Sequence, residues 1–149
     1  MNLLQQIESD LTAAMKSGDS VRSGTLKMVK SDMMYEKAKT GEDLNDEQML
    51  EVVTRAAKRR RESIEEYRRG NREDLAEQEA AELVIIEAYL PEQMSDEDIE
   101  KAVSEKIAEM GEVTQKDFGR VMGVLMKDLK GKADGKAVKS ALTKALEGK

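Results

Sequence analysis

The sequence predicts an all-α protein, and three observations lead to that prediction. Helix formers such as alanine, leucine, glutamate, lysine and arginine dominate the chain. It has one proline, three tyrosines and no tryptophan, whereas a β-sandwich or barrel needs frequent turn residues and aromatic or β-branched strands. Apolar residues make up 39% and charged residues 38% of its 149 residues. We therefore expect helices that each have one apolar face and one charged face.

The first two expected helices are separated by Gly18, which is a typical residue after a helix end. Asp19 or Ser20 can cap the second helix. The stretch 40–43 is expected to be a loop. Apolar residues at helical spacing are expected to share the buried faces: Leu3, Leu4, Ile7, Leu11, Ala14 and Met15 in helix 2–17, then Val21, Leu26, Val29, Met33 and Met34 in helix 20–39.

The next two expected helices carry the clearest start and stop signals. Asn45 with Gln48 three residues later indicates a capping box, which opens a long helix that ends before Gly70. Asn71 with Asp74 indicates the start of a fourth helix, which we expect to reach about residue 89.

Pro91 predicts a boundary between two domains, 1–92 and 93–149, because proline cannot continue a helix and also restricts the residue before it. Three shorter helices are expected after it. Their start signals are an N-cap serine followed by three acidic residues, a threonine with an aspartate three residues later, and a capping aspartate. These signals are Ser95, Thr114 with Asp117, and Asp134, while Gly111 and Gly131 end the first two helices. The expected fold is a four-helix bundle-like domain followed by a small three-helix domain.

The composition excludes several kinds of chemistry. The chain has no cysteine and no histidine, so it offers no thiolate or imidazole metal ligand and no Cys/His or Ser/His/Asp nucleophile. We predict no catalytic residue, no metal site and no cofactor. Carboxylate pairs such as Glu73/Glu77 and Glu79/Glu82 are expected on solvated helix faces. No signal peptide and no apolar run of about 20 residues is present, so a cytoplasmic location away from membranes is expected.

Charge is strongly segregated along the chain. The net charge is −6, but the segments 55–72 and 113–149 are basic, and the very acidic segment 73–112 separates them. Fields of one sign affect the choice of partner more than the fold. The two basic segments are therefore the candidate binding surfaces.

The first candidate surface is the basic helix. Arg55, Lys58, Arg59 and Arg61 could contact phosphates, since the flat guanidinium fork suits them. A solvated face with local Arg–Glu pairs explains the same cluster. Arg60 lies on the apolar stripe of this helix, so we expect it to pair with an acid of a neighbouring helix or to extend to the edge.

The second candidate surface surrounds the turn between the last two helices. Lys127, Lys130, Lys132 and Lys136 flank that turn, close to the free backbone N–H groups of a helix start. Favourable placement of cations at a helix end explains Lys127 and Lys130 but not the other two. Because aromatic residues are scarce, we expect recognition of an RNA backbone rather than base stacking.

Five motifs along the chain give a resemblance to the YqeY-like proteins, which are related to the C-terminal tail of the GatB subunit of glutamine-dependent tRNA amidotransferases. The resemblance covers nearly the whole chain. Arg59 replaces a usual glutamine of the family, and Lys127-Asp128 stands where a proline often follows the methionine. The motifs are KRRRESI at 58–64, GNREDLA at 70–76, YLPEQ at 89–93, DFGRVMG at 117–123 and KGKADG at 130–135.

The resemblance implies a helical bundle followed by a three-helix domain, and a tRNA or a tRNA-handling enzyme as the partner. It also implies the label of a carbon–nitrogen ligase that uses glutamine as amido donor. No residue here supports that chemistry, so we expect an accessory module without a catalytic site of its own. A protein–protein adaptor, in which the segment 73–112 docks a basic partner, is the alternative.

Overall fold

A computed structural model describes all 149 residues and confirms the all-α prediction, with seven α-helices, one 3₁₀ helix and no strand. The chain divides into two compact units, Met1–Pro91 and Glu92–Lys149, called here the N-terminal and C-terminal units. No helix has both the length and the apolar character that crossing a membrane requires.

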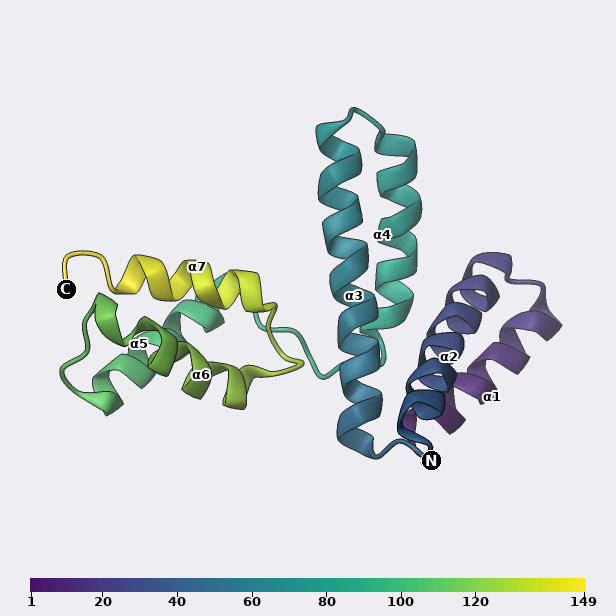
Figure 1. The fold of residues 1–149 in the computed structure, drawn as a ribbon. Coiled ribbons are helices and arrows are strands. Elements are labelled where there is room, and N and C mark those ends of the chain that lie inside the picture. Colours follow the sequence, from purple (N-terminus) through teal and green to yellow (C-terminus); the bar gives the residue numbers. More distant parts are fainter. The chain divides into compact units, whose positions relative to one another are not determined.

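The N-terminal unit consists of two helical hairpins. The first hairpin pairs α1 with α2, and the second pairs α3 with α4 (Figure 1). Both α3 and α4 also contact α2, so α2 joins the hairpins. The helices are α1 (Leu3–Ser17), α2 (Ser20–Thr40), α3 (Asp46–Arg69) and α4 (Glu73–Glu87).

Most helix boundaries of this unit follow the expected caps. Asn45 and Gln48 form the reciprocal capping box of α3, and Asp19 caps α2 by accepting from the Arg22 N–H. The prediction for α4 was wrong in detail. Asn71 adopts a left-handed conformation with φ 58°, so it completes the turn after α3, and α4 starts at Glu73 without a side-chain cap. The helix ends at Glu87, before the expected residue 89.

The core of the N-terminal unit draws on all four helices, with Ile7, Leu26, Met33 and Ile86 fully buried. Tyr89 follows α4 and donates a hydrogen bond from its hydroxyl to the Asp10 carboxylate of α1, which ties the end of the unit back to its first helix. Burial raises the pKa of Tyr89 to about 12, and the bond to Asp10 adds to this shift.

Helix α2 differs from the expectation at its outer residues. Its buried face consists of Thr25, Leu26, Val29 and Met33, but Val21 is 50% exposed and Met34 is 37% exposed. Both had been expected on the buried face. The apolar residues of α2 span more than one face, and a single neighbouring hairpin cannot cover them all. Met15 of α1 is exposed as well.

The C-terminal unit packs three helices around their own core. Ser95 caps α5 by accepting from the Asp98 N–H, and Thr114 with Asp117 forms a capping box. That box opens a 3₁₀ turn, η1 (Gln115–Asp117), and not an α-helix directly. The fully buried residues come from all three helices and include Val103, Val121 and Leu142. The helices are α5 (Asp96–Met110), α6 (Phe118–Leu129) and α7 (Gly135–Ala145).

Candidate nucleic-acid interface

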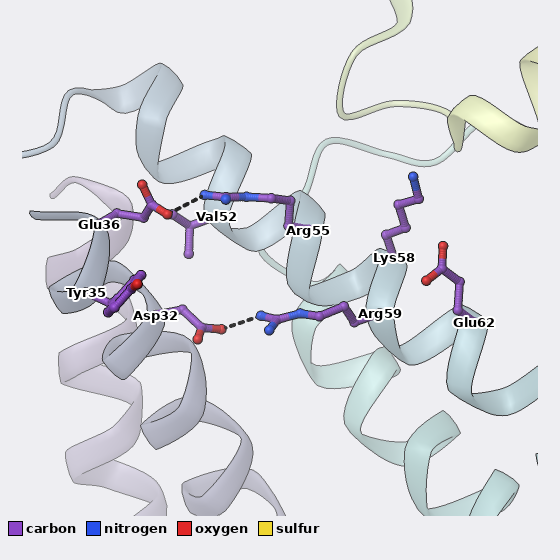
Figure 2. Close-up of a pocket in the computed structure, with 8 residues that line it drawn as sticks. All are labelled: Asp32, Tyr35, Glu36, Val52, Arg55, Lys58, Arg59 and Glu62. Atoms are coloured by element: carbon purple, nitrogen blue, oxygen red, sulfur yellow. Dashed lines mark hydrogen bonds and ion pairs between the residues drawn. The ribbon is translucent and has the colours of Figure 1, made fainter. Parts of the chain in front are cut away.

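The arginines of α3 that face α2 are paired with carboxylates. The Arg55 Nη2 atom lies 3.2 Å from Oε1 of Glu36, and the Arg59 Nη2 atom lies 2.7 Å from Oδ2 of Asp32. Figure 2 shows both guanidinium groups reaching from α3 toward α2. The acids come from a neighbouring helix and not from α3 itself, so the cluster differs from the expected local Arg–Glu pairs. The positive charge of Arg55 and Arg59 is nevertheless largely neutralised.

A shallow cavity of about 420 Å³ lies over these pairs between α2 and α3. Lys58 also lines it but extends away from both carboxylates (Figure 2). Helical spacing therefore brings Lys58 to the same face as Arg55 and Arg59. Of the three cations, Lys58 forms no ion pair with a carboxylate.

The other two arginines of this segment face α4. Arg61 is paired with Glu87, with 3.3 Å between its Nη2 atom and Oε1. Arg60 is only 6% exposed, and it lies between Glu79 and Glu82 of α4, each 3.8 Å from one of its nitrogens. The expectation of a partner acid from a neighbouring helix is therefore met. Glu79 and Glu82, expected on a solvated face, are half-buried.

The Arg60 site is an ion pair cluster with incomplete hydrogen bonding. Its Nε atom has no hydrogen-bond partner, and its Nη2 atom donates to the Met28 sulfur at 3.6 Å. Burial raises the pKa of Glu82, as does the neighbouring Glu79, while Arg60 opposes both effects. Every guanidinium among Arg55, Arg59, Arg60 and Arg61 thus lies within 4 Å of a carboxylate from another helix of the N-terminal unit.

The turn between α6 and α7 is held by backbone geometry. Gly131 has φ 79°, a conformation that suits glycine. Its carbonyl accepts a 2.8 Å hydrogen bond from Nε2 of Gln93, and the Lys132 carbonyl accepts another of 2.8 Å from the Met94 N–H. Asp134 caps α7 as expected. The turn is therefore fixed by the segment that enters the C-terminal unit.

The four lysines around this turn, Lys127, Lys130, Lys132 and Lys136, are all exposed. The nearby carboxylate of Asp128 is paired with Lys106 at 3.3 Å. Lys127 and Lys132 take part in no ion pair. On the first candidate surface Lys58 is the one exposed cation without an ion pair, whereas this turn presents two such lysines, Lys127 and Lys132.

Sequence reasoning missed the surface of α6 that leads to this turn. Gly119 and Gly123 are exposed, and a Cβ added at either would meet nothing within 4 Å. With Lys127 they follow one another at intervals of four residues, so the three lie on one face of α6. The pattern G-x-x-x-G-x-x-x-K was visible in the sequence. On α7, Lys139 is also exposed, three residues after Lys136.

Residues 4–146 match the model of a family described as Yqey-like protein. The chain belongs to the YqeY-like family. No group of three or more histidine, cysteine, aspartate or glutamate side chains lies close enough together to hold a metal ion. Membership by itself assigns no reaction and no ligand.

Individual relatives are distant. The chain is 26% identical over 133 residues to Altered inheritance of mitochondria protein 41, mitochondrial, of Pyrenophora tritici-repentis, covering 88% of this chain and 73% of the relative. It is 32% identical over 94 residues to an uncharacterized protein of Schizosaccharomyces pombe, covering 63% and 76%. A Lachancea thermotolerans protein that shares the name of the first relative is 28% identical over 113 residues, covering 74% and 60%.

Proposed function

We propose that this YqeY-like protein binds tRNA, alone or held by a tRNA-handling enzyme, through the lysines around the α6–α7 turn. The supporting observation is the difference between the two candidate surfaces. On the first surface Arg55, Arg59 and Arg61 are engaged by carboxylates and only Lys58 is not. At the α6–α7 turn, Lys127 and Lys132 are both exposed cations without an ion pair, next to a rigid turn. The resemblance of the C-terminal unit to the GatB tail supports tRNA as the polyanion.

The glycine face of α6 supports the same proposal. With no side chain at Gly119 or Gly123, a phosphate backbone can lie close to the helix and reach Lys127 from the side. Sequence-independent contacts of this kind recognise the shape and backbone of RNA. The protein is proposed to position tRNA as an accessory module, with any amide transfer carried out by a partner.

The test measures anisotropy of labelled tRNA across a salt series. In the variant Lys127→Glu/Lys132→Glu, we expect affinity near 0.1 M salt to fall by at least about tenfold and the slope of log K against log salt to fall by about two, one per lost phosphate contact. The control Lys101→Glu/Lys116→Glu makes the same change of charge at two other exposed lysines of the C-terminal unit.

Equal losses in both variants would show that only net charge matters, and an unchanged affinity in the first variant would reject this surface. A bulky substitution, Gly123→Leu, is expected to weaken binding without changing charge. Pull-down in which protein partners persist after nuclease treatment, with no tRNA affinity for the purified chain, would favour the adaptor function instead.

A role beside an amidotransferase is tested by a glutamine-dependent transamidation assay with and without the chain. No change in rate or yield would contradict that role. The cytoplasmic location expected from the sequence stays a prediction, because several relatives carry the word mitochondrial in their names.

A further inference from the structure

Helix α2 has a second regular face that lies outside the core of the N-terminal unit and stays largely exposed. One edge of this face borders α4: Val21, Gly24 and Met28 line a groove with Gln78 and Glu82. The face consists of three larger residues at intervals of seven and three small residues, each three positions after a larger one. All six are exposed, and the larger ones are 50%, 51% and 66% exposed in chain order. The larger residues are Val21, Met28 and Tyr35, and the small ones are Gly24, Ser31 and Ala38. We call these six residues the α2 stripe.

Nothing in the structure of its own chain requires a glycine at position 24. Glycine inside a helix costs about 1 kcal/mol relative to alanine, and α2 adopts ordinary helical geometry here. A Cβ built at Gly24 would meet nothing within 4 Å. No packing constraint of the N-terminal unit therefore requires a residue this small, and the space above it is open to another chain.

The stripe has the spacing of a helix–helix seam. Large and small residues occupy the a and d positions of a heptad, the pattern with which helices interlock side by side. The core of the unit uses a different face of α2, with Leu26, Val29 and Met33. The stripe is therefore a second apolar face and not an extension of the first.

We propose that two copies of this protein pair through their α2 helices in antiparallel orientation. In antiparallel pairs an a residue faces a d residue. One register then opposes Val21 to Ala38 of the partner subunit, Gly24 to Tyr35 of the partner subunit, and Met28 to Ser31 of the partner subunit. Each larger side chain meets a small one, and the two-fold axis repeats every contact. Parallel pairing would oppose tyrosine to tyrosine and glycine to glycine, which combines a clash with a void.

The charges beside the stripe agree with this register. Lys27 lies on one flank and is placed next to Met34 of the partner subunit, so its stem packs on an apolar side chain. Asp32, on the other flank, is neutralised by Arg59 at 2.7 Å. No two like charges are opposed, and nothing in the register repels a second copy.

The area that the interface would bury sets the expected affinity of the dimer. The stripe spans 18 residues, or about 27 Å at about 1.5 Å per residue, on a helix about 10–12 Å wide. Burying it on both copies removes on the order of 1,000 Å² from solvent, the lower limit for a specific interface. We expect a dissociation constant on the order of 10–100 μM, so that the dimer forms at high protein concentration.

Sedimentation equilibrium of the full chain without RNA, from about 5 to 500 μM, tests the proposal at concentrations set by that expected constant. We expect a monomer–dimer equilibrium. Gly24→Gln should weaken the dimer at least tenfold while leaving the thermal midpoint unchanged or higher, because glutamine favours helix and the site is open. The control Ser9→Gln, at an exposed position of α1, should dimerise like the wild type.

Cross-linking tests the register. The natural chain has no cysteine, so one introduced cysteine is the only thiol on each copy that a cross-linker can react with. Ser31→Cys, near the two-fold axis, should cross-link with a short bismaleimide, and Val21→Cys alone should not. A mixture of Val21→Cys and Ala38→Cys should give the mixed dimer. A monomer at 500 μM, dimerisation unaffected by Gly24→Gln, or efficient cross-linking of Val21→Cys alone would each overturn the proposal, whatever the outcome for tRNA.

Discussion

Replacing Arg60, Glu79 and Glu82 together with methionine should leave the N-terminal unit as stable as before or stabilise it by up to about 2 kcal/mol. Arg60 is 6% exposed, and both of its carboxylate contacts are 3.8 Å long. Each contact supplies a gross attraction of about 4 kcal/mol at an effective dielectric of about 20. The opposing costs are several kcal/mol for desolvating the charges and about 1–3 kcal/mol for the unpartnered Nε–H. The attraction and these costs nearly cancel.

The three methionines keep most of the side-chain volume and remove the whole buried charge cluster, so no carboxylate is left without its cation. Arg60→Ala should instead cost about 2–4 kcal/mol, because it leaves a cavity between α3 and α4. The control Arg59→Met removes an exposed ion pair with Asp32 and should change stability by less than about 1 kcal/mol.

The assay is guanidinium denaturation followed by tyrosine fluorescence. All three tyrosines lie in the N-terminal unit and the chain has no tryptophan, so this signal reports that unit alone. The midpoint and slope together give the free energy of unfolding. A loss of more than about 2 kcal/mol in the triple methionine variant, approaching that of Arg60→Ala, would refute the reasoning and show that the buried ion pairs stabilise the fold.

Three further predictions concern single positions. The folded-state pKa of Tyr89 is about 12 against 10.0 for the free side chain, so the folded state holds this proton more tightly. The tighter binding stabilises the fold by roughly 1–2 kcal/mol after allowing for solvent. This stabilisation is present below pH 10 and is lost as pH rises to 12. Absorbance at 295 nm should show this late ionisation, and Tyr89→Phe should abolish it; a late step that persists would contradict the assignment. Gly123→Ala should stabilise the chain by up to about 1 kcal/mol in thermal unfolding, and destabilisation would mean that the space above α6 is not open. Ser95→Ala should cost about 1 kcal/mol, measured by far-ultraviolet circular dichroism, and an unchanged midpoint would show that the cap on α5 contributes nothing.

Helix number and most helix ends followed from local sequence, because the information that determines a cap lies within four residues. Asn45 with Gln48 and Ser95 with its acidic followers illustrate this. Asn71 was misread because an asparagine can cap a helix or adopt the left-handed conformation at a turn. The turn after Arg69 uses the second option, and the local sequence does not distinguish the two.

The partners of the arginines could not be predicted, because they depend on which helices pack together. Asp32 and Arg59 are 27 residues apart, and in so charged a chain each has many other candidate partners. Periodicity placed Arg60 on a buried stripe correctly but could not name Glu79 and Glu82. Likewise, Val21 was assigned to a core because a one-dimensional pattern does not show which of two apolar faces a neighbour covers.

The hydrogen bonds from Gln93 and Met94 to the α6–α7 turn mean that a change at the turn would also affect these two residues. The main chain enters the C-terminal unit through these two residues, three positions after Leu90, which belongs to the core of the other unit. A ligand that distorts Gly131 or Lys132 would disturb the same two carbonyls that anchor the incoming segment. Binding at the lysines around this turn would therefore be coupled to the order of residues 93 and 94, and hydrogen exchange at the Met94 amide would report a binding event that makes no direct contact with it.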